Sequence, residues 1–589
     1  MNKIQETIIK NKLITLYKEG KYQEASPYCQ QLIAVNQKDM HLWYTFGQIQ
    51  EKLNNPDPAV KAFLNATKIK SEITHQALEK AIDISTKHNL IALGFMAATS
   101  LVKADPESEY ANFKAGSFAL DLQLNYLSAQ HFKKTIELQE TENKNYRTLY
   151  AQALNCLGRT TEALAQYAKA IQIDPSDDYA YFRAAFAHNY SEDIDEDVVF
   201  SAHKSYGELL KSKFPKIEPF KPKQKPKRIK VAYLSKDFGS HPIAYFILPI
   251  IQNSNKDLFE TFIYSDESVS KEDKMTDKIK QYCERWTCCK EMTDDELYFK
   301  VRHDEIDILV DLQGLTGFPR MSIFARRAAP IQVTYLGYPN TTGLENMDYR
   351  IVDHWTDPVG MTEKFNSETL VRLPSGFICY SPELPKLDVS ELPALNIGKL
   401  TFGSFNFYGK VTPSILKTWT TILNSVENSQ LLIKAKCFNE AHNVEQIQEL
   451  FASEGISKNR LILLSWTRDE KAHLSLYNQV DIHLDTTPYN GTTTTCEALW
   501  LGVPTITLAG VNHRSRVGCS ILEQVGLQDF IATSKEEYIN IAIEKAKDLQ
   551  ALSSLRVNMR ERLKDSKLLD TGLFVKEIEE AYLDMYKKL

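Results

Sequence analysis

The sequence contains no apolar run long enough to cross a bilayer. Its longest apolar stretch covers about residues 243–251 and includes Pro249, whereas a spanning helix needs about 20 apolar residues. The first residues also lack the basic start and apolar segment of a secretory signal. We therefore expect neither a membrane span nor a signal peptide.

Charge of one sign is not in excess, and cysteine is sparse. The chain has 70 Lys and Arg against 76 Asp and Glu, a formal net charge of -6, so no general basic field attracts nucleic acid. The nine cysteines are an odd number scattered over a long chain, which is typical of free thiols in a reducing compartment. These features predict a cytoplasmic protein that does not bind nucleic acid.

Two common nucleotide motifs and the usual zinc signature are also missing. Neither G-x-G-x-x-G nor G-x-x-x-x-G-K-[ST] occurs, so dinucleotide and ATPase chemistry are not supported. Cys283, Cys288 and Cys289 lie close together, but they lack a matching cysteine pair or histidine at zinc spacing. We predict no metal site and no cofactor.

What is present indicates several domains. The chain has 589 residues, of which 43% are hydrophobic and 25% charged, too many for one compact core. Small residues recur every 34 or 35 positions, at Ala25, Ala59, Gly94, Ala129 and Ala163. This is the period of the tetratricopeptide repeat, a pair of antiparallel helices.

Turn residues fit the same repeat. A Gly or Asn that tolerates the left-handed conformation precedes the small residue by five positions, at Gly20, Asn54, Asn89 and Gly158. We predict a helical solenoid with capping helices over residues 1–210, whose groove would hold a peptide. A Pro- and Lys-rich linker is expected over residues 211–228.

From residue 228 the pattern changes to alternating strands and helices. The first run of expected strands covers residues 228–234, 259–264, 306–312 and 331–336, and the second covers 400–402, 430–434, 461–464, 481–484 and 505–508. Thr412 followed by Pro413 predicts a helix start. The fold class is therefore α + α/β, with two open parallel-sheet domains over residues 229–395 and 396–589. Ligands of such sheets bind beyond the carboxyl ends of the strands.

A threonine-rich segment follows one of these strands. After the strand ending at Leu484, Gly491 precedes four threonines, residues 492–495, that open a helix. Backbone N–H groups and hydroxyls at a helix start can bind a phosphate, and Glu497 could accept hydrogen bonds from ribose hydroxyls. The alternative is that the threonines only cap and pack the helix.

Two other residues after strands could complete such a site. Lys410 stands just before the predicted Thr412 helix and could neutralise a leaving diphosphate. His241 follows the first strand and could act near neutral pH. By themselves, a surface lysine and a structural histidine would be the simpler interpretations.

Taken together, these segments resemble the protein O-GlcNAc transferase family and, within it, the SPINDLY branch. The resemblance covers nearly the whole chain and rests on residues 231–242, 329–339, 402–410 and 484–497. It implies a two-lobed GT-B catalytic region of two Rossmann-like domains. It also implies metal-independent, inverting transfer from a nucleotide sugar to Ser or Thr of proteins.

The resemblance also implies roles for single residues. His241 matches a cleft histidine beside the donor sugar and acceptor, and Lys410 matches the lysine on the donor diphosphate. The implied donor-binding residues are Asn406, Lys410, His473, Thr492, Thr493, Thr494 and Glu497, of which Thr493 and Thr494 match phosphate contacts, Glu497 a ribose contact and His473 a residue near the base.

The chain also departs from the O-GlcNAc transferases. It has Thr492, Phe407 and Glu470 where they commonly have His, Gln and Lys. The run Gly-Thr-Thr-Thr-Thr-Cys-Glu is instead similar to SPINDLY, whose donor is GDP-fucose, so UDP-GlcNAc and GDP-fucose both stay open as donors. We expect a protein O-glycosyltransferase that transfers a single sugar. The alternatives are transfer to Asn, to a small molecule or to a glycan, and a non-catalytic repeat scaffold.

Overall fold

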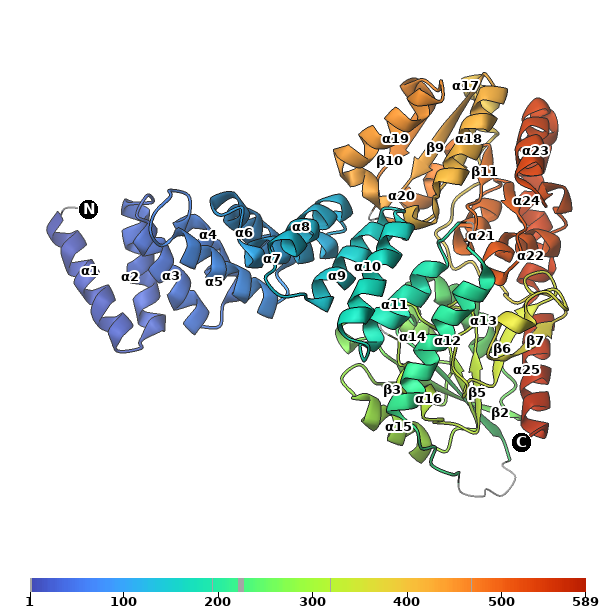
Figure 1. Cartoon of the computed structure of the whole chain (residues 1–589), viewed down its shortest axis with the longest axis horizontal. Helices are drawn as coiled ribbons and strands as arrows, with labels where there is room; N and C mark the ends of the chain where they lie inside the picture. The colour runs from blue at the N-terminus through green and yellow to red at the C-terminus, as the bar shows by residue number, and fades with distance from the viewer. Residues whose placement is uncertain (1–2, 193, 221–226, 318, 468) are drawn as a thin grey trace. The chain divides into compact units, whose positions relative to one another are not determined.

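The structure is a computed structural model that describes residues 3–192, 194–220, 227–317, 319–467 and 469–589. The chain forms two compact units, Met1–Leu157 and Gly158–Leu589. The described part of the first unit is helical, and the second unit combines helices with two β-sheets (Figure 1).

Successive helices joined by short turns build the first unit. They are α1 (Lys3–Lys18), α2 (Tyr22–Val35), α3 (Met40–Lys52), α4 (Pro56–Ala66), α5 (Thr74–Lys87), α6 (Ile91–Ala104), α7 (Glu109–Asp121), α8 (Asn125–Leu138) and α9 (Lys144–Cys156). Each helix packs mainly against the ones before and after it. This nearest-neighbour packing is that of a helical solenoid and confirms the predicted repeats.

The repeated small residues lie where helices approach closely. Ala25 and Ala59 are fully buried, and Ala129 is nearly so. A Cβ atom on Gly94 would lie 2.3 Å from the ring of Phe118, so a larger side chain would force the two helices apart. The period therefore marks the tightest helix contacts.

The predicted turns have the expected backbone conformation. Gly20, Asn54 and Asn89 have φ values of 73°, 57° and 55°, in the left-handed region that Gly and Asn tolerate best. In the following repeat the turn residue with positive φ is Gln123 (φ 60°), which precedes Ala129 by six positions and not by five. Glutamine is not a residue that marks such a turn, and the sequence did not predict it there.

The second unit opens with α10 (Thr160–Ile173), α11 (Asp178–His188) and α12 (Glu196–Lys213). Phe182 of α11 and Tyr206 of α12 are packed in one core with Phe324 and Tyr338 of the first sheet domain. The boundary between the units therefore falls within residues 1–210, because these helices bury aromatic side chains against the first sheet.

The segment predicted as a linker begins inside a helix. Its first residues, Lys211 to Lys213, complete α12, and the guanidinium of Arg302 lies 3.9 Å from the centre of the Phe220 ring. Residues 221–226 of this segment lie outside the described residues.

The first sheet is parallel throughout. Its strands are β1 (Ile229–Ser235), β2 (Phe259–Ser265), β3 (Arg285–Cys288), β4 (Ile308–Asp311), β5 (Ile331–Thr334), β6 (Tyr349–Asp353) and β7 (Thr369–Leu373), in the order β3-β2-β1-β4-β5-β6-β7. Between them run α13 (Pro242–Asn253), α14 (Lys274–Lys280), α15 (Asp294–His303) and α16 (Met321–Ala325). The sequence pattern did not predict β3, β6 or β7.

The second sheet repeats the same winding. Its strands are β8 (Leu400–Ser404), β9 (Ser429–Lys434), β10 (Leu461–Leu464), β11 (Ile482–Leu484), β12 (Thr505–Leu508) and β13 (Ile531–Ala532), in the order β10-β9-β8-β11-β12-β13. Its helices are α17 (Pro393–Ile397), α18 (Pro413–Ser425), α19 (Ala441–Ser453), α20 (Glu470–Ser475), α21 (Thr493–Trp500), α22 (Val517–Gln524), α23 (Lys535–Lys547) and α24 (Leu549–Lys564). The two predicted parallel sheets are confirmed.

The last helix, α25 (Thr571–Lys587), returns to the first sheet. Its Phe574, Ile578 and Tyr582 are buried in the same core as Val231 of β1, and Figure 1 draws α25 beside β7. The end of the predicted second lobe, residues 396–589, therefore completes the core of the first.

No described helix is both long and apolar enough to cross a membrane. All nine cysteines lie in the described part of the chain, and each is a free thiol. The expectation of unpaired cysteines is therefore met.

Candidate functional site

The loops at the carboxyl ends of both sheets meet at one pocket. It has a volume of about 280 Å³ and is lined by His241, Pro242, Ile243, Phe246, Leu336, Gly337, Asn406, Phe407, Lys410, Thr492, Thr493 and Thr494. Strand order reverses in each sheet beside β1 and β8, and these switch points are where open α/β sheets bind ligands. Six predicted site residues from distant parts of the sequence thus share one cavity.

The threonine run begins α21 as predicted. Thr492 is the N-cap and Thr493 the first helical residue, so the first N–H groups of the helix have no partner within it. Thr492, Thr493 and Thr494 are partly exposed, whereas Thr495 is buried and its hydroxyl donates to the carbonyl of Gly491 at 3.1 Å. Three threonines therefore face the pocket, and the fourth closes the turn.

Two contacts hold the Lys410 ammonium group. Its Nζ donates to the carbonyl oxygen of Asn490 at 2.7 Å and lies 3.8 Å from the centre of the Tyr489 ring. Burial lowers the pKa of Lys410, and the carboxylate of Asp485 opposes this shift. The lysine is therefore a fixed, partly desolvated cation at the pocket wall.

Asp485 organises the loop around this cation, and the sequence did not reveal its role. Its carboxylate accepts hydrogen bonds from the N–H groups of Thr486 and Gly491, at 2.9 and 2.7 Å, and from the hydroxyl of Thr507 at 2.8 Å. Burial raises the pKa of Asp485, and these bonds together with Lys410 oppose the shift. A carboxylate directly after a strand was the one available signal.

Asn406 joins this carboxylate to the threonines. Its Nδ2 lies 3.4 Å from Asp485 Oδ1, and its Oδ1 accepts the hydroxyl hydrogen of Thr494 at 2.9 Å. The side chain is buried. It fixes the hydroxyl of Thr494 at the helix start.

His241 comes from the opposite lobe. It caps α13, where its Nδ1 accepts from the N–H of Ile243 at 3.3 Å and lies 3.7 Å from Asp237 Oδ1. Partial desolvation lowers the pKa of His241, and Asp237 opposes the shift. With Nδ1 engaged at the helix start, Nε2 is the nitrogen left for a ligand.

His473 and Glu497 contact one another beside this pocket and are not among its described lining residues. His473 Nε2 lies 3.3 Å from Glu497 Oε2, and His473 Nδ1 lies 2.7 Å from Nζ of Lys434. The hydroxyl of Tyr477 also donates to Glu497, at 3.2 Å. Lys434 and Tyr477 are additions that sequence reasoning missed.

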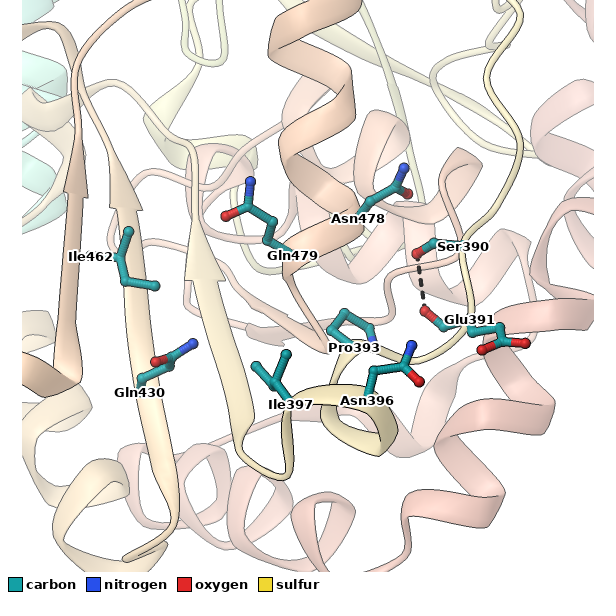
Figure 2. A pocket seen from close by; sticks show the side chains of 9 residues that line it. All are labelled: Ser390, Glu391, Pro393, Asn396, Ile397, Gln430, Ile462, Asn478 and Gln479. Atoms are coloured by element: carbon teal, nitrogen blue, oxygen red, sulfur yellow. Dashed lines mark hydrogen bonds between the residues drawn. The ribbon is translucent and has the colours of Figure 1, made fainter.

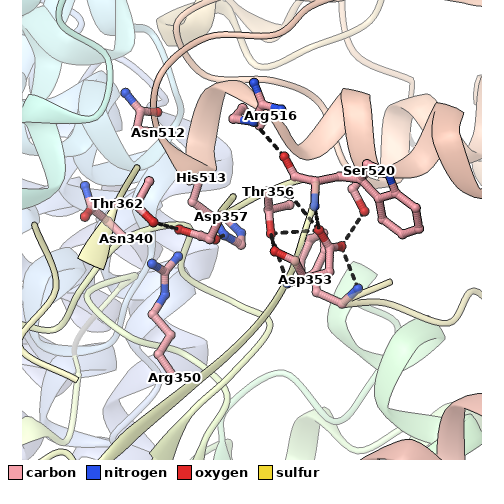
Figure 3. Close-up of polar contacts among 12 residues, drawn as sticks. Asn340, Arg350, Asp353, Thr356, Asp357, Thr362, Asn512, His513, Arg516 and Ser520 are labelled. Atoms are coloured by element: carbon pink, nitrogen blue, oxygen red, sulfur yellow. Dashed lines mark hydrogen bonds and ion pairs between the residues drawn. The ribbon is translucent and has the colours of Figure 1, made fainter. Parts of the chain in front are cut away.

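A second polar cluster joins the two lobes. Figure 3 shows Asp357, in the loop after β6, between Thr362 and His513 of the second sheet domain. His513 Nδ1 lies 2.6 Å from Asp357 Oδ2, and Ser520 donates to Asp353 at 2.5 Å. These buried contacts tie the lobes together, and nothing in the local sequence pattern predicted them.

Another pocket of the second sheet domain lies near the amino ends of its strands. It has a volume of about 400 Å³ and is lined by Gln430, Ile462 and Asn478, among others (Figure 2). Gln430 and Ile462 stand near the amino ends of β9 and β10. Because ligands of these sheets bind at the carboxyl ends, the pocket of Lys410 is the candidate ligand site. Among the described residues, no group of three His, Cys, Asp or Glu side chains could hold a metal ion.

Two family models match the chain. "Glycosyl transferase family 41" matches residues 209–381 and 391–578, and a tetratricopeptide repeat model matches residues 41–73. The first match covers both sheets, and the second covers α3 and α4.

Curated relatives and one solved structure agree with these models. A probable UDP-N-acetylglucosamine–peptide N-acetylglucosaminyltransferase SPINDLY of Solanum lycopersicum is 35% identical over 421 residues, 71% of this chain and 45% of the relative. That of Arabidopsis thaliana is 37% identical over 422 residues, 71% of this chain and 46% of the relative. The chain thus spans less than half the length of these relatives.

The solved structure is a lysine-to-methionine mutant of the Thermobaculum terrenum O-GlcNAc transferase. It has a TM-score of 0.78 and 28% identity, and the match covers 88% of this chain and 99% of that one. The predicted order of helical repeats followed by a two-lobed GT-B region is confirmed by this likeness.

Proposed function

Because this chain belongs to glycosyl transferase family 41, we propose that it is a protein O-glycosyltransferase, which moves one sugar from a nucleotide sugar to Ser or Thr. One observation carries the proposal: Lys410, the threonine helix start and His241 line the same pocket although they come from two lobes. A cation and helix N–H groups suit a diphosphate, and the histidine stands on the opposite wall.

The proposed reaction needs stabilisation of a leaving group. The acceptor hydroxyl oxygen forms a bond to the anomeric carbon as the bond to the diphosphate breaks, and negative charge gathers on the diphosphate. Lys410 and the first N–H groups of α21 are fixed before reaction, so they stabilise that charge without reorganising. His241 would orient the hydroxyl through Nε2 while α13 holds its Nδ1, and the hydroxyl proton would pass to this Nε2 or to water as the new bond forms.

The nucleoside would lie toward His473 and Glu497. The carboxylate of Glu497 can accept hydrogen bonds from ribose hydroxyls, and Tyr477 and His473 hold its position. Lys434 fixes the other nitrogen of His473. We further propose that the enzyme needs no metal, because Lys410 supplies the positive charge that a divalent cation would provide.

The donor is UDP-GlcNAc or GDP-fucose. The names of the relatives specify UDP-N-acetylglucosamine, whereas the threonine run resembles the branch that uses GDP-fucose. The deciding experiment incubates the purified chain and dephosphorylated lysate proteins with each donor separately. Mass spectrometry of the proteins then reads the mass added, and Lys410→Ala serves as the inactive control.

Sugar on Ser or Thr from one donor supports the proposal and names the sugar. Sugar found only on Asn or on small molecules contradicts it. Binding of neither UDP nor GDP, measured by calorimetry, would instead favour a scaffold without catalysis.

We also propose that the helical repeats hold the acceptor protein, since solenoids offer a continuous groove for extended peptides. Removing residues 1–157 takes away the first compact unit and leaves the second whole. The shortened protein should still bind donor and hydrolyse it slowly, but protein transfer should fall strongly. Unchanged protein transfer would show that the repeats serve another purpose.

A further inference from the structure

Two loops hold Lys410, and a helical part of the same unit contacts both. A Cβ on Gly158 would lie 3.1 Å from the carbonyl oxygen of Val411, next to the lysine. Glu192 accepts the N–H of Ser414 at 3.2 Å, in the first turn of α18, which follows that loop. Residues that precede β1 in the chain therefore pack against the segment after β8 that carries Lys410, residues 405–414.

The second loop, residues 485–491, is linked to helix α12 by hydrogen bonds of Arg514. Glu196 of α12 accepts from Nη2 and Nη1 of Arg514 at 2.6 and 3.0 Å. The carbonyl oxygen of Arg514 in turn accepts the N–H of Asn490 at 2.9 Å. Asn490 is the residue whose carbonyl oxygen holds Lys410.

Tyr190, just after α11, makes the most direct of these contacts. Its ring centre lies 5.3 Å from that of Tyr489, with 34° between the rings, and 6.1 Å from that of Phe407. Tyr190 is buried. The Lys410 ammonium lies 3.8 Å from the Tyr489 ring centre. Tyr190 therefore packs against the same aromatic ring that the lysine contacts.

We propose that Tyr190 is a positioning residue for Lys410, because it packs against the Tyr489 ring, over which the ammonium group lies, and against Phe407, which lines the same pocket. This inference rests on the proposed function of the same site. Paired aromatic rings hold preferred geometries, and a lysine over a ring is stabilised by the electrostatics of that ring. If Tyr190 is shortened, Tyr489 gains room to turn and the lysine loses its fixed direction.

Other groups facing Lys410 come from the second sheet and from the opposite lobe. Asp485 is the nearby carboxylate and Asn490 supplies the carbonyl oxygen, while His241 lines the far side of the pocket. Burial lowers the pKa of Lys410. Water admitted behind Tyr489 would weaken that burial and move the lysine back toward its ordinary pKa.

Three variants test the role of Tyr190 in the full chain. Tyr190→Leu removes the ring, Tyr190→Phe keeps it, and Phe182→Leu removes another buried ring of the same helical part. Phe182 is a matched control because its ring partners are Tyr179 and Tyr206, which lie outside the Lys410 loops.

We expect Tyr190→Leu to lower kcat by about tenfold or more and to change KM for the donor by less than about threefold, since small misplacements of a catalytic group cost rate. Tyr190→Phe should restore kcat. Phe182→Leu should lose thermal stability but keep kcat. An equal loss of kcat in Phe182→Leu, or normal kcat in Tyr190→Leu, would overturn the proposal.

A second measurement does not depend on turnover, so it tests the role of Tyr190 even if the chain transfers no sugar. Each full-length variant is treated with an amine-acylating reagent over a range of pH, and the peptide with Lys410 is followed by mass spectrometry. The midpoint of Lys410 acylation should move to higher pH in Tyr190→Leu and stay in place in Tyr190→Phe and Phe182→Leu. An unmoved midpoint in Tyr190→Leu would overturn the proposal, whereas inactivity of the unaltered chain with both donors would overturn only the proposed function.

Discussion

In each sheet the fourth strand along the chain is followed by a loop whose N–H groups bind a buried aspartate, but the charges around the two aspartates differ. Asp311 ends β4 and accepts from the N–H groups of Gln313 and Gly314, at 3.0 Å each, and from the hydroxyl of Thr334 on β5 at 2.8 Å. Asp485 follows β11 and likewise accepts from two N–H groups of its loop and from a threonine of β12. A buried carboxylate thus folds the loop after the switch-point strand in both lobes.

The difference lies in what comes next to the carboxylate. The positive charge of Lys410 favours the ionised form of Asp485, whereas the charged group that acts on Asp311 is the carboxylate of Glu368, which disfavours it. Burial raises the pKa of Asp311 to about 6 and raises that of Asp485 as well. The shared topology therefore supplies the loop, and the charge placed beside it makes one lobe the proposed donor site.

The largest effect should come from removing that charge. Lys410→Ala should lower transfer by about two orders of magnitude or more, the scale for losing a preorganised charge next to a developing anion. The matched control is Lys236→Ala, which removes a lysine directly after β1 of the first lobe. Steady-state kinetics of both variants would show equal losses if the asymmetry between the lobes were wrong.

The pH dependence should report the same lysine. Since burial lowers the pKa of Lys410, its positive charge is present below that lowered pKa and is lost as the pH rises through it. Transfer should therefore fall on the alkaline side at a lower pH than an exposed lysine would give. In Lys410→Arg the guanidinium stays charged, so the alkaline fall in kcat should disappear even if the rate is lower throughout.

Replacing the two carboxylates should separate structure from chemistry. Asp485→Asn and Asp311→Asn each set an amide donor against backbone N–H donors, which should cost about 1–3 kcal/mol in the free energy of unfolding. Only Asp485→Asn should also lower the pKa of Lys410 further, because it removes the opposing carboxylate. Denaturant unfolding and pH–rate profiles of both variants provide the test, and an identical shift in both profiles would contradict the comparison.

The smallest effect should come from chelation. We expect less than about a twofold change in transfer after treatment with EDTA, because the proposed donor site uses a lysine and helix N–H groups where other enzymes use a metal ion. Loss of activity on chelation, restored by Mg²⁺ or Mn²⁺, would contradict the proposal that Lys410 supplies the positive charge of the donor site.

Much of the fold follows from local patterns. The strands over residues 461–464 and 505–508 were predicted with the observed bounds, and the hydroxyl of Thr412 caps α18 by accepting from Ile415 at 3.3 Å. Strands β6 and β7 were missed because no clear turn or periodicity sets residues 349–353 and 369–373 apart from their surroundings. The return of α25 to the first sheet was missed for a similar reason, since an amphipathic helix does not specify which core it covers.

The candidate site was predictable where it lies directly after strands. His241, Asn406, Lys410 and the threonines follow strand ends, and parallel strands bring such ends to one edge. Their roles remain predictions. Tyr190 and His513 were not found, because the partners named for them, Phe407 and Tyr489 for Tyr190 and Asp357 for His513, lie at least 156 positions away. An aromatic residue or a histidine alone marks no particular contact.

The sequence by itself determined the repeats, the two sheets and the polar residues that follow their strands, because helix and strand periods and turn residues act over a few neighbours. Tertiary structure alone decided that Asp485 organises the loop, residues 485–491, that holds Lys410. It also decided that α11 and α12 belong to the core of the second unit, and that Asp357 contacts His513. These outcomes depend on burial and on donors and acceptors brought together from distant segments. Their energies arise only when the chain has packed.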